Sequence, residues 1–166
     1  MIRLRIFLSV ISFVLLFGTL PKVEAHEIRP AIVTAKFSET GVYTIEINAN
    51  LEALISGISA SHKNTEESPK AQTYDALRQL PPTVLSKRIR AFMPAFLDGI
   101  HVTFDDRRAD LKLTHIRVPK VGDLALPRHT KITFSGTAPA GEPILTWRYA
   151  PVFGDSVFRV HGAIGG

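Results

Sequence analysis

Histidine side chains are the groups in this chain best suited to bind a metal ion, because its 166 residues include no cysteine. The imidazoles are widely separated, and no two of them form an HxH, HxxxH or HExxH pair. The six positions are His26, His62, His101, His115, His129 and His161. The chain also contains no GxSxG sequence and no glycine-rich phosphate loop. These patterns indicate no enzyme class, and we expect a non-enzymatic protein.

His26 differs from the other histidines in its position. It follows Val23-Glu24-Ala25, a sequence of the kind that signal peptidase cuts. After that cut, His26 would carry a free α-amine, with a pKa near about 7.7, beside its imidazole. The two nitrogens together bind one Cu(II) ion, and a second imidazole completes a T-shaped site. We therefore predict His26 as a copper ligand, and the alternative is a solvated first residue. The candidates for the second ligand are His101, His115 and His161.

The first 25 residues have the three parts of a secretory signal peptide. They are the charged start MIRLR, the apolar run IFLSVISFVLLFGTL and the small-x-Ala end. The apolar run is interrupted by Ser, Gly and Thr, and it is shorter than the roughly 20 residues of a spanning helix. We expect cleavage after Ala25, which sends the mature chain to the bacterial periplasm or outside the cell. An uncleaved membrane anchor is the alternative.

The mature chain is only modestly basic. The signal peptide carries three basic residues and one acid, so its removal lowers the formal net charge from +5 to +3. This excess does not favour a nucleic acid partner, and export argues against one. Residues 26–166 are long enough to bury a stable core without disulfides. We therefore expect a single exported domain, of unassigned oligomeric state.

The mature chain begins with two strand-like runs. Apolar and polar residues alternate along each run, which is the period of a half-buried strand. The polar sequence SETG separates them, and Gly41 can take a positive φ there, so a β-hairpin is predicted. The inward positions are Ala31, Val33, Ala35 and Phe37, followed by Tyr43, Ile45 and Ile47.

Residues 51–98 change to helical spacing. LEALISGIS predicts a short helical turn, Ser68-Pro69 predicts a helix start, and LPP ends that helix. A longer helix, capped by Thr83 and kinked or shortened at Pro94, would bury an apolar stripe. The stripe comprises Leu85, Ile89, Phe92 or Met93, and Phe96. The basic residues Lys87, Arg88 and Arg90 fall on the solvated face, and contact with anionic headgroups is the weaker alternative.

Residues 99–166 return to short alternating strands. A change of phase after Leu113 predicts a bulge near Thr114-His115. Trp147 and Tyr149 are predicted to pack in the core, with Arg148 pointing outward. The whole pattern predicts a mainly β protein, an antiparallel, immunoglobulin-like β-sandwich with a helical insertion at about 51–98. The sequence VHGAIGG at the end allows two interpretations, a short natural tail or truncation of a longer protein.

Several segments together carry a resemblance to a known family. They are AHEIRPA, LEALISGI, YDALRQLPP, FLDGI, VGDLAL and LTWRYAPVFGDSVFRV, which span about residues 25–160. They resemble the exported amino-terminal region of bacterial HupE/UreJ-like membrane proteins, although none is a catalytic signature. The resemblance implies a soluble periplasmic domain followed by membrane helices, whose relatives are linked to nickel supply for hydrogenase and urease. Those helices are not in this sequence, and the resemblance assigns no ligand residue.

Three functions follow as hypotheses. The first is the non-enzymatic, extracytoplasmic part of a HupE/UreJ-like membrane protein, in contact with a membrane partner and in a metal-transport context, with copper or nickel as the metal. The second is a soluble periplasmic copper-binding protein that uses His26. The third is a secreted hydrolase with a dispersed site, since a serine-based triad needs no sequence signature.

Overall fold

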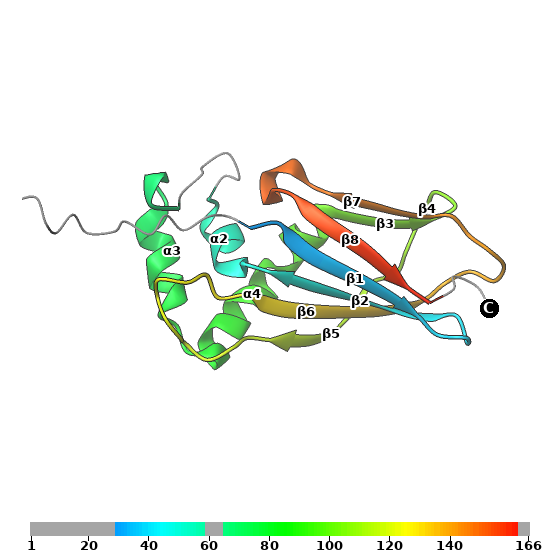
Figure 1. Ribbon diagram of the computed structural model, residues 1–166, viewed down its shortest axis with the longest axis horizontal. Helices are drawn as coiled ribbons and strands as arrows, with labels where there is room; N and C mark the ends of the chain where they lie inside the picture. The colour runs from blue at the N-terminus through cyan, green and yellow to red at the C-terminus, as the bar shows by residue number, and fades with distance from the viewer. Residues whose placement is uncertain (1–28, 59–64, 163–166) are drawn as a thin grey trace, which may run out of the picture.

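The computed structural model describes residues 29–58 and 65–162 (Figure 1). The predicted signal peptide, His26, His62 and residues 163–166 lie outside the described residues. The strands are β1 (Ala31–Phe37), β2 (Val42–Ala49), β3 (Ile100–Phe104), β4 (Arg107–Arg108), β5 (Lys112–Arg117), β6 (Thr130–Thr137), β7 (Leu145–Tyr149) and β8 (Ser156–His161). The helices are α2 (Leu51–Ser56), α3 (Ala71–Arg78) and α4 (Pro82–Asp98), with 3-10 turns at Thr65–Glu67 and Pro151–Phe153. The prediction of a mainly β protein is confirmed.

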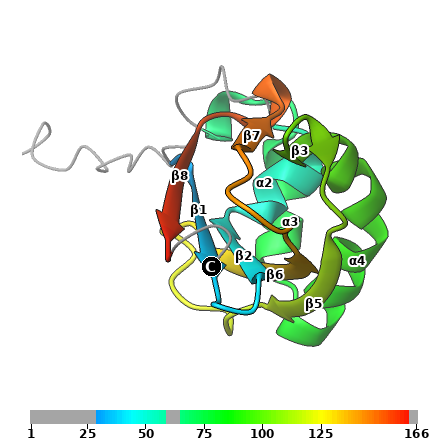
Figure 2. The ribbon, with the colours of Figure 1, turned by 90° about the vertical axis from the view of Figure 1, so that its right-hand side faces the viewer.

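The described strands form two sheets. The larger sheet has the order β5-β6-β2-β1-β8, and the smaller has the order β4-β3-β7. Figure 2 shows the sheets on two sides of the core, with α4 beside the opening between them. The inward side chains of both sheets and the apolar stripe of α4 form one buried cluster. The two-sheet, sandwich-like architecture therefore agrees with the sequence prediction.

One strand pair departs from the predicted antiparallel arrangement. β8 runs parallel to β1, in a register that pairs Ala31 with Ser156 and Lys36 with His161. The reason is the connection, because the chain leaves β7 in the other sheet and turns at Pro151–Phe153 before reaching β1. The chain reaches the larger sheet beside the start of β1, where Ala31 N–H donates a hydrogen bond to the Asp155 carbonyl (2.9 Å). From there β8 runs in the same direction as β1. The larger sheet is thus mixed.

The local predictions for the strands are confirmed at the hairpin and at the bulge. β1 and β2 pair around the SETG turn, from Phe37 with Tyr43 to Ile32 with Asn48. The pairing of β5 with β6 shifts between Leu113 and His115, where the phase change predicted a bulge. The bulge keeps the apolar side chains of β5 facing inward on both sides of the phase change.

The helical segment agrees with its predicted stripe and differs at both helix starts. Leu85, Ile89 and Phe96 are fully buried, as predicted. Ser68 accepts a hydrogen bond from Lys70 N–H (3.2 Å), but α3 begins only at Ala71, so the predicted start at Ser68-Pro69 is wrong. The 3-10 turn ends at Glu67, and a bend and turn at residues 68–70 separate it from α3.

In α4 the N-cap is Pro81, so the predicted cap at Thr83 is also wrong. Pro82 stands at the first helical position, where a missing N–H breaks no hydrogen bond and the helix can begin earlier. The helix also continues past Pro94 to Asp98, so the predicted shortening did not occur. Among the described residues, no helix is long and apolar enough to cross a membrane.

Candidate functional site

The strand-associated histidines proposed as partners of His26 lie far apart in the fold. His101 lies on the outward side of β3, in the smaller sheet. His115 and His161 lie on β5 and β8, which are the opposite edges of the larger sheet. Within residues 29–58 and 65–162, no three His, Asp or Glu side chains gather closely enough to hold a metal ion. The structure therefore does not bring these three imidazoles together, and His26 lies outside the described residues.

Copper binding at His26 stays a prediction that a titration can check. If the α-amine and imidazole bind Cu(II) together, a mature chain beginning at His26 should bind more tightly than one carrying a single extra residue before it. The extra residue converts the amine to an amide and removes one ligand. Equal affinity of the two forms would reject this amine-imidazole site.

A polar groove of about 180 Å³ opens beside His101. Its other lining residues are Thr103, Asp106, Thr146 and Arg148. One imidazole and one carboxylate are too few ligands for a structural metal site, and the guanidinium of Arg148 opposes a cation there. A larger open groove, of about 480 Å³, lies between the start of α4 and β5 and has no carboxylate in its lining. Neither groove has the donor set of a metal centre.

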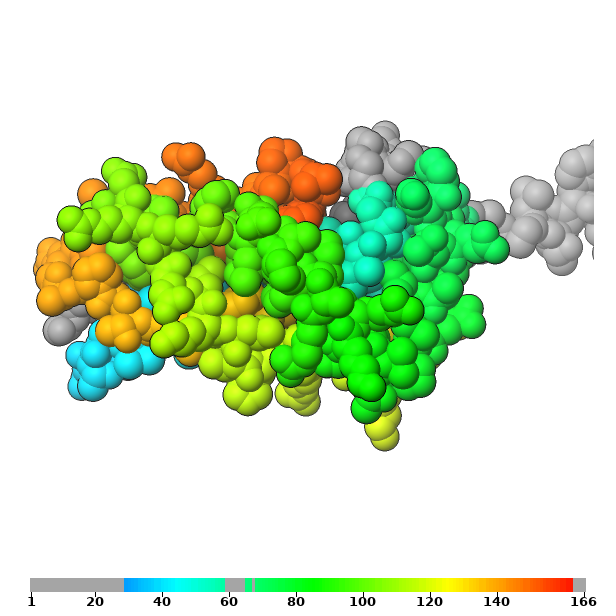
Figure 3. Space-filling model, turned by 180° about the vertical axis from the view of Figure 1, so that it is seen from behind, coloured from blue at the N-terminus to red at the C-terminus, as the bar shows by residue number. Residues whose placement is uncertain are grey.

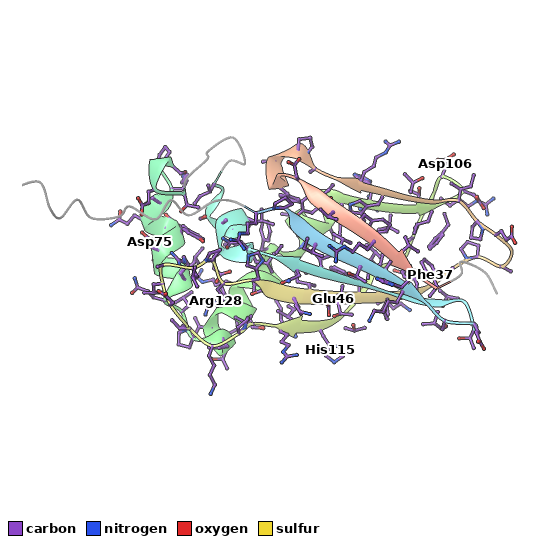
Figure 4. All side chains as sticks on the ribbon, viewed as in Figure 1. Phe37, Glu46, Asp75, Asp106, His115 and Arg128 are labelled. Carbon is purple, nitrogen blue, oxygen red and sulfur yellow. The ribbon has the colours of Figure 1, made fainter. Side chains whose placement is uncertain are left out.

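Among the described residues, the most unusual group of charged side chains is buried. Glu52 of α2 is fully buried, and its Oε1 accepts a hydrogen bond from Arg128 Nε at 2.7 Å. Arg128 comes from the connection between β5 and β6, and its side chain is 8% exposed. Arg78, at the end of α3, is 5% exposed and adds a second guanidinium. We call Glu52, Arg78 and Arg128 the charged cluster; Arg128 is labelled in Figure 4.

Main-chain carbonyls also accept hydrogen bonds from the charged cluster, although Glu52 Oε2 and Arg78 Nε have no hydrogen-bond partner among the described residues. Arg128 also donates to the carbonyls of Leu80 (3.1 Å) and Leu77 (3.3 Å), after and within α3. Arg78 donates to the carbonyls of Leu124 and Leu126 (2.7 Å), in the connection that carries Arg128. The two arginines therefore tie α2, α3 and this connection into one unit, with positive charge placed on carbonyls at the end of α3.

The electrostatics of the charged cluster favour a structural role. Burial raises the pKa of Glu52, while the hydrogen bond and charge of Arg128 and the charge of Arg78 act in the opposite direction. Glu52 has no exposure to solvent, and both guanidiniums are held by backbone oxygens. We therefore interpret the charged cluster as a link between α2, α3 and the β5–β6 connection, with almost no contact with solvent.

Sequence reasoning did not identify the charged cluster. Glu52 lies within LEALI, and a glutamate there is expected on the exposed side of a short helix. The one signal in the sequence is that the apolar residues Leu51 and Ala53 flank Glu52. In the structure both of these neighbours are buried as well. Arg78 and Arg128 had no distinguishing pattern, because their carbonyl partners are set by tertiary structure.

Tyr74 adjoins the charged cluster and links it to Asn50, the residue between β2 and α2. Its hydroxyl accepts a hydrogen bond from Asn50 Nδ2 (2.7 Å), while Asn50 Oδ1 caps α2 by accepting from Ala53 N–H (3.2 Å). The guanidinium carbon of Arg78 lies 5.1 Å from the centre of the Tyr74 ring, within range of a cation–π interaction.

All three tyrosines should resist ionisation while the chain is folded. Burial raises the pKa of Tyr43 to about 12, with a further contribution from Asp110, and it also raises the pKa of Tyr74 and Tyr149. The folded state therefore keeps protons that the unfolded state releases above pH 10, so stability falls as pH rises past that value. Absorbance titration should show no tyrosinate near pH 10 until the protein unfolds. A phenol that ionises near pH 10 with the fold intact would contradict this.

Aromatic rings connect the two sheets at the β7 and β8 side. The Trp147 ring stacks on Phe158 (centroids 5.2 Å apart) and on Tyr149 (5.9 Å). Trp147 Nε1 also donates to Ser156 Oγ (3.1 Å). Trp147 and Tyr149 are partly buried and pack against the core, while Arg148 is exposed, so the predicted orientation of the three side chains is confirmed. β8 is thus held against β7 by side chains, although its backbone pairs with β1.

Comparison of the chain with protein-family models, with curated proteins and with solved structures found no match in any of the three.

Proposed function

We propose that this chain is an exported, non-enzymatic domain, the extracytoplasmic part of a HupE/UreJ-like membrane protein in a metal-transport context. The proposal is supported most by where the resembling segments lie. LEALISGI supplies Glu52, YDALRQLPP supplies Arg78, and VGDLAL supplies the carbonyls that receive Arg78. Arg128 follows VGDLAL by two residues and reaches Glu52.

This convergence matters because the segments are far apart in the sequence. A chance likeness in separate short segments has no reason to gather at one place in the fold. A buried ion pair needs all of its partners together, since an isolated buried charge is strongly unfavourable. The three segments therefore form one structural unit in this chain, so the resemblance covers residues that pack together in the fold and not scattered surface positions.

An immunoglobulin-like strand plan is part of the proposal. With the strands taken in chain order, β1, β2, β5 and β6 correspond to A, B, D and E, and β3 and β7 correspond to C and F. In the larger sheet β5-β6-β2-β1 then reads D-E-B-A, and in the smaller sheet the β3-β7 pair reads C-F, which is the order in immunoglobulin constant domains; the two-residue strand β4, on the other side of β3, has no counterpart among these letters. The last strand differs, because β8 pairs with β1 while its side chains pack against β7. The helices α2–α4 are an insertion between B and C.

The proposed location can be tested in cells of the source bacterium with an antibody against the mature domain. We expect the protein in the membrane fraction, resistant to extraction with alkaline carbonate, and digested by protease added to spheroplasts. A cytoplasmic protein that survives the same protease treatment is the control for intact inner membranes.

The other outcomes separate the competing hypotheses. Release of the protein by osmotic shock, with nothing in the washed membranes, would reject a membrane protein and favour a soluble periplasmic one. Protection from protease in spheroplasts would reject export altogether.

A further inference from the structure

The outward side of the larger sheet is strongly basic. Strand register places its side chains in three rows that each cross all five strands. From β5 to β8 the rows are Arg117, Lys131, Asn48, Ile32 and Val157, then His115, Thr133, Glu46, Thr34 and Arg159, and then Lys112, Ser135, Thr44, Lys36 and His161. We call these positions the basic face.

The charges on the basic face have one sign almost throughout. Five lysines and arginines stand on it, and Glu46 is the one carboxylate in its rows. Glu46 Oε1 lies 2.8 Å from Lys131 Nζ, so these two charges offset each other. Lys112 is weakly paired with Asp110 at the rim (3.8 Å), both side chains being mostly exposed. The exposed cations Lys36, Arg117 and Arg159 remain, one on β1 and the other two on the edge strands.

No described element covers the basic face. The strands of the larger sheet lie toward the viewer in Figure 1, where α2 and α3 stand at one end of the sheet. The view from behind shows α4 next to the β4–β5 segment (Figure 3). Arg108 ties these two segments together by donating to the Leu97 carbonyl (2.7 Å). The helices therefore pack on the core side or the end of the sheet, apart from the first turn of α4, which shares an open groove with His115 and Arg117 at the β5 edge.

We propose that the basic face docks on a bilayer surface rich in anionic phospholipids. Neighbouring strands lie about 4.8 Å apart, so five strands spread the cations over a width of roughly 20 Å. This spread of charge over an open sheet suits an extended negative surface. Each Lys or Arg close to such a surface raises the affinity of the protein for it by roughly fivefold. Val157, 42% exposed on the edge strand, adds apolar contact next to Arg159. The docking is a property of the domain and does not depend on membrane helices following it.

The test is cosedimentation of the mature chain, residues 26–166, with lipid vesicles. Vesicles of phosphatidylcholine containing phosphatidylglycerol should bind it, pure phosphatidylcholine should not, and added salt should release it. The triple variant Lys36→Gln, Arg117→Gln, Arg159→Gln should lose on the order of 100-fold in affinity. The matched control is the triple variant Lys87→Gln, Arg88→Gln, Arg90→Gln on the exposed side of α4. It changes the net charge by the same amount, and its affinity for the vesicles should fall by less than about tenfold.

Three results would overturn the docking proposal. They are equal losses in the two triple variants, equal binding to neutral and anionic vesicles, and binding to heparin without binding to anionic vesicles. Circular dichroism of both variants establishes that the fold is unchanged, which is expected because all six side chains are exposed. Extraction of cell membranes with alkaline carbonate tests the proposed function alone. Carbonate releases a domain that is held only by contacts with the membrane surface, and it leaves a membrane-spanning protein in place.

Discussion

Replacing Arg128 with methionine should lower the free energy of unfolding by about 3–5 kcal/mol, the usual loss when one partner of a buried ion pair is removed. The variant leaves Glu52 fully buried without its cation. It also removes the donor to the carbonyls of Leu77 and Leu80. Chemical denaturation followed by the fluorescence of Trp147, the one tryptophan of the chain, measures the change.

The matched control is Arg88→Met on the exposed side of α4, which should change stability by no more than about 0.5 kcal/mol. Adding Glu52→Gln to Arg128→Met should recover part of the loss, because the buried carboxylate is then replaced by a neutral amide. A loss for Arg128→Met no larger than for Arg88→Met would show that the charged cluster does not hold the helices.

The loss in Arg128→Met should depend on pH. Burial already raises the pKa of Glu52 above 4.5, and removing Arg128 takes away the partner that most opposes this. A folded-state pKa above the unfolded value means that the folded chain binds the proton first as pH falls, so the variant gains stability on acidification. The difference from the wild type should therefore shrink from neutral pH toward about pH 5. A difference that does not change with pH would contradict an ionised Glu52.

The second large effect is expected at Gly136. A Cβ there would lie 2.2 Å from the hydroxyl of Tyr43 and 2.6 Å from the Asp110 carbonyl, too close for either. Tyr43 is fully buried and donates to that same carbonyl (2.9 Å). Gly136→Ala should therefore cost about 2–4 kcal/mol, from overpacking together with the disturbed hydrogen bond. Thermal and chemical denaturation measure it.

The matched control for Gly136 is Gly122→Ala in the exposed connection. No atom lies within 4 Å of a Cβ built at Gly122, so that variant should be neutral or slightly stabilised. Adding Tyr43→Phe to Gly136→Ala should not restore stability, because the ring carbon at 2.4 Å and the backbone carbonyl still clash. Equal stability of the two alanine variants would contradict the close approach of the Tyr43 ring and the Asp110 carbonyl to Gly136.

The sequence predicted the elements whose information is local. Alternation placed Ala31, Val33 and Ala35 on one side of β1, and a phase change located the bulge after Leu113. Period-2 and period-3.6 patterns report which side of a segment is buried, so they also located the stripe of α4.

The parallel pairing of β8 with β1 and the charged cluster were not predictable in the same way. Strand order depends on a crossover between sheets, which leaves no period in the sequence. Arg128 reaches an acid 76 positions away, and a surface arginine and a buried one look alike in one sequence. The basic face was hidden for the same reason, because its rows are defined by register across five strands.

Mass spectrometry of the native polypeptide, captured from solubilised membranes with an antibody to the domain, tests the proposed function most directly. A processed, membrane-anchored protein predicts an amino-terminal peptide that begins at His26 and, in the same polypeptide, apolar peptides that continue beyond Gly166. A polypeptide that retains residues 1–25, or one whose last peptide ends at Gly166, would contradict it.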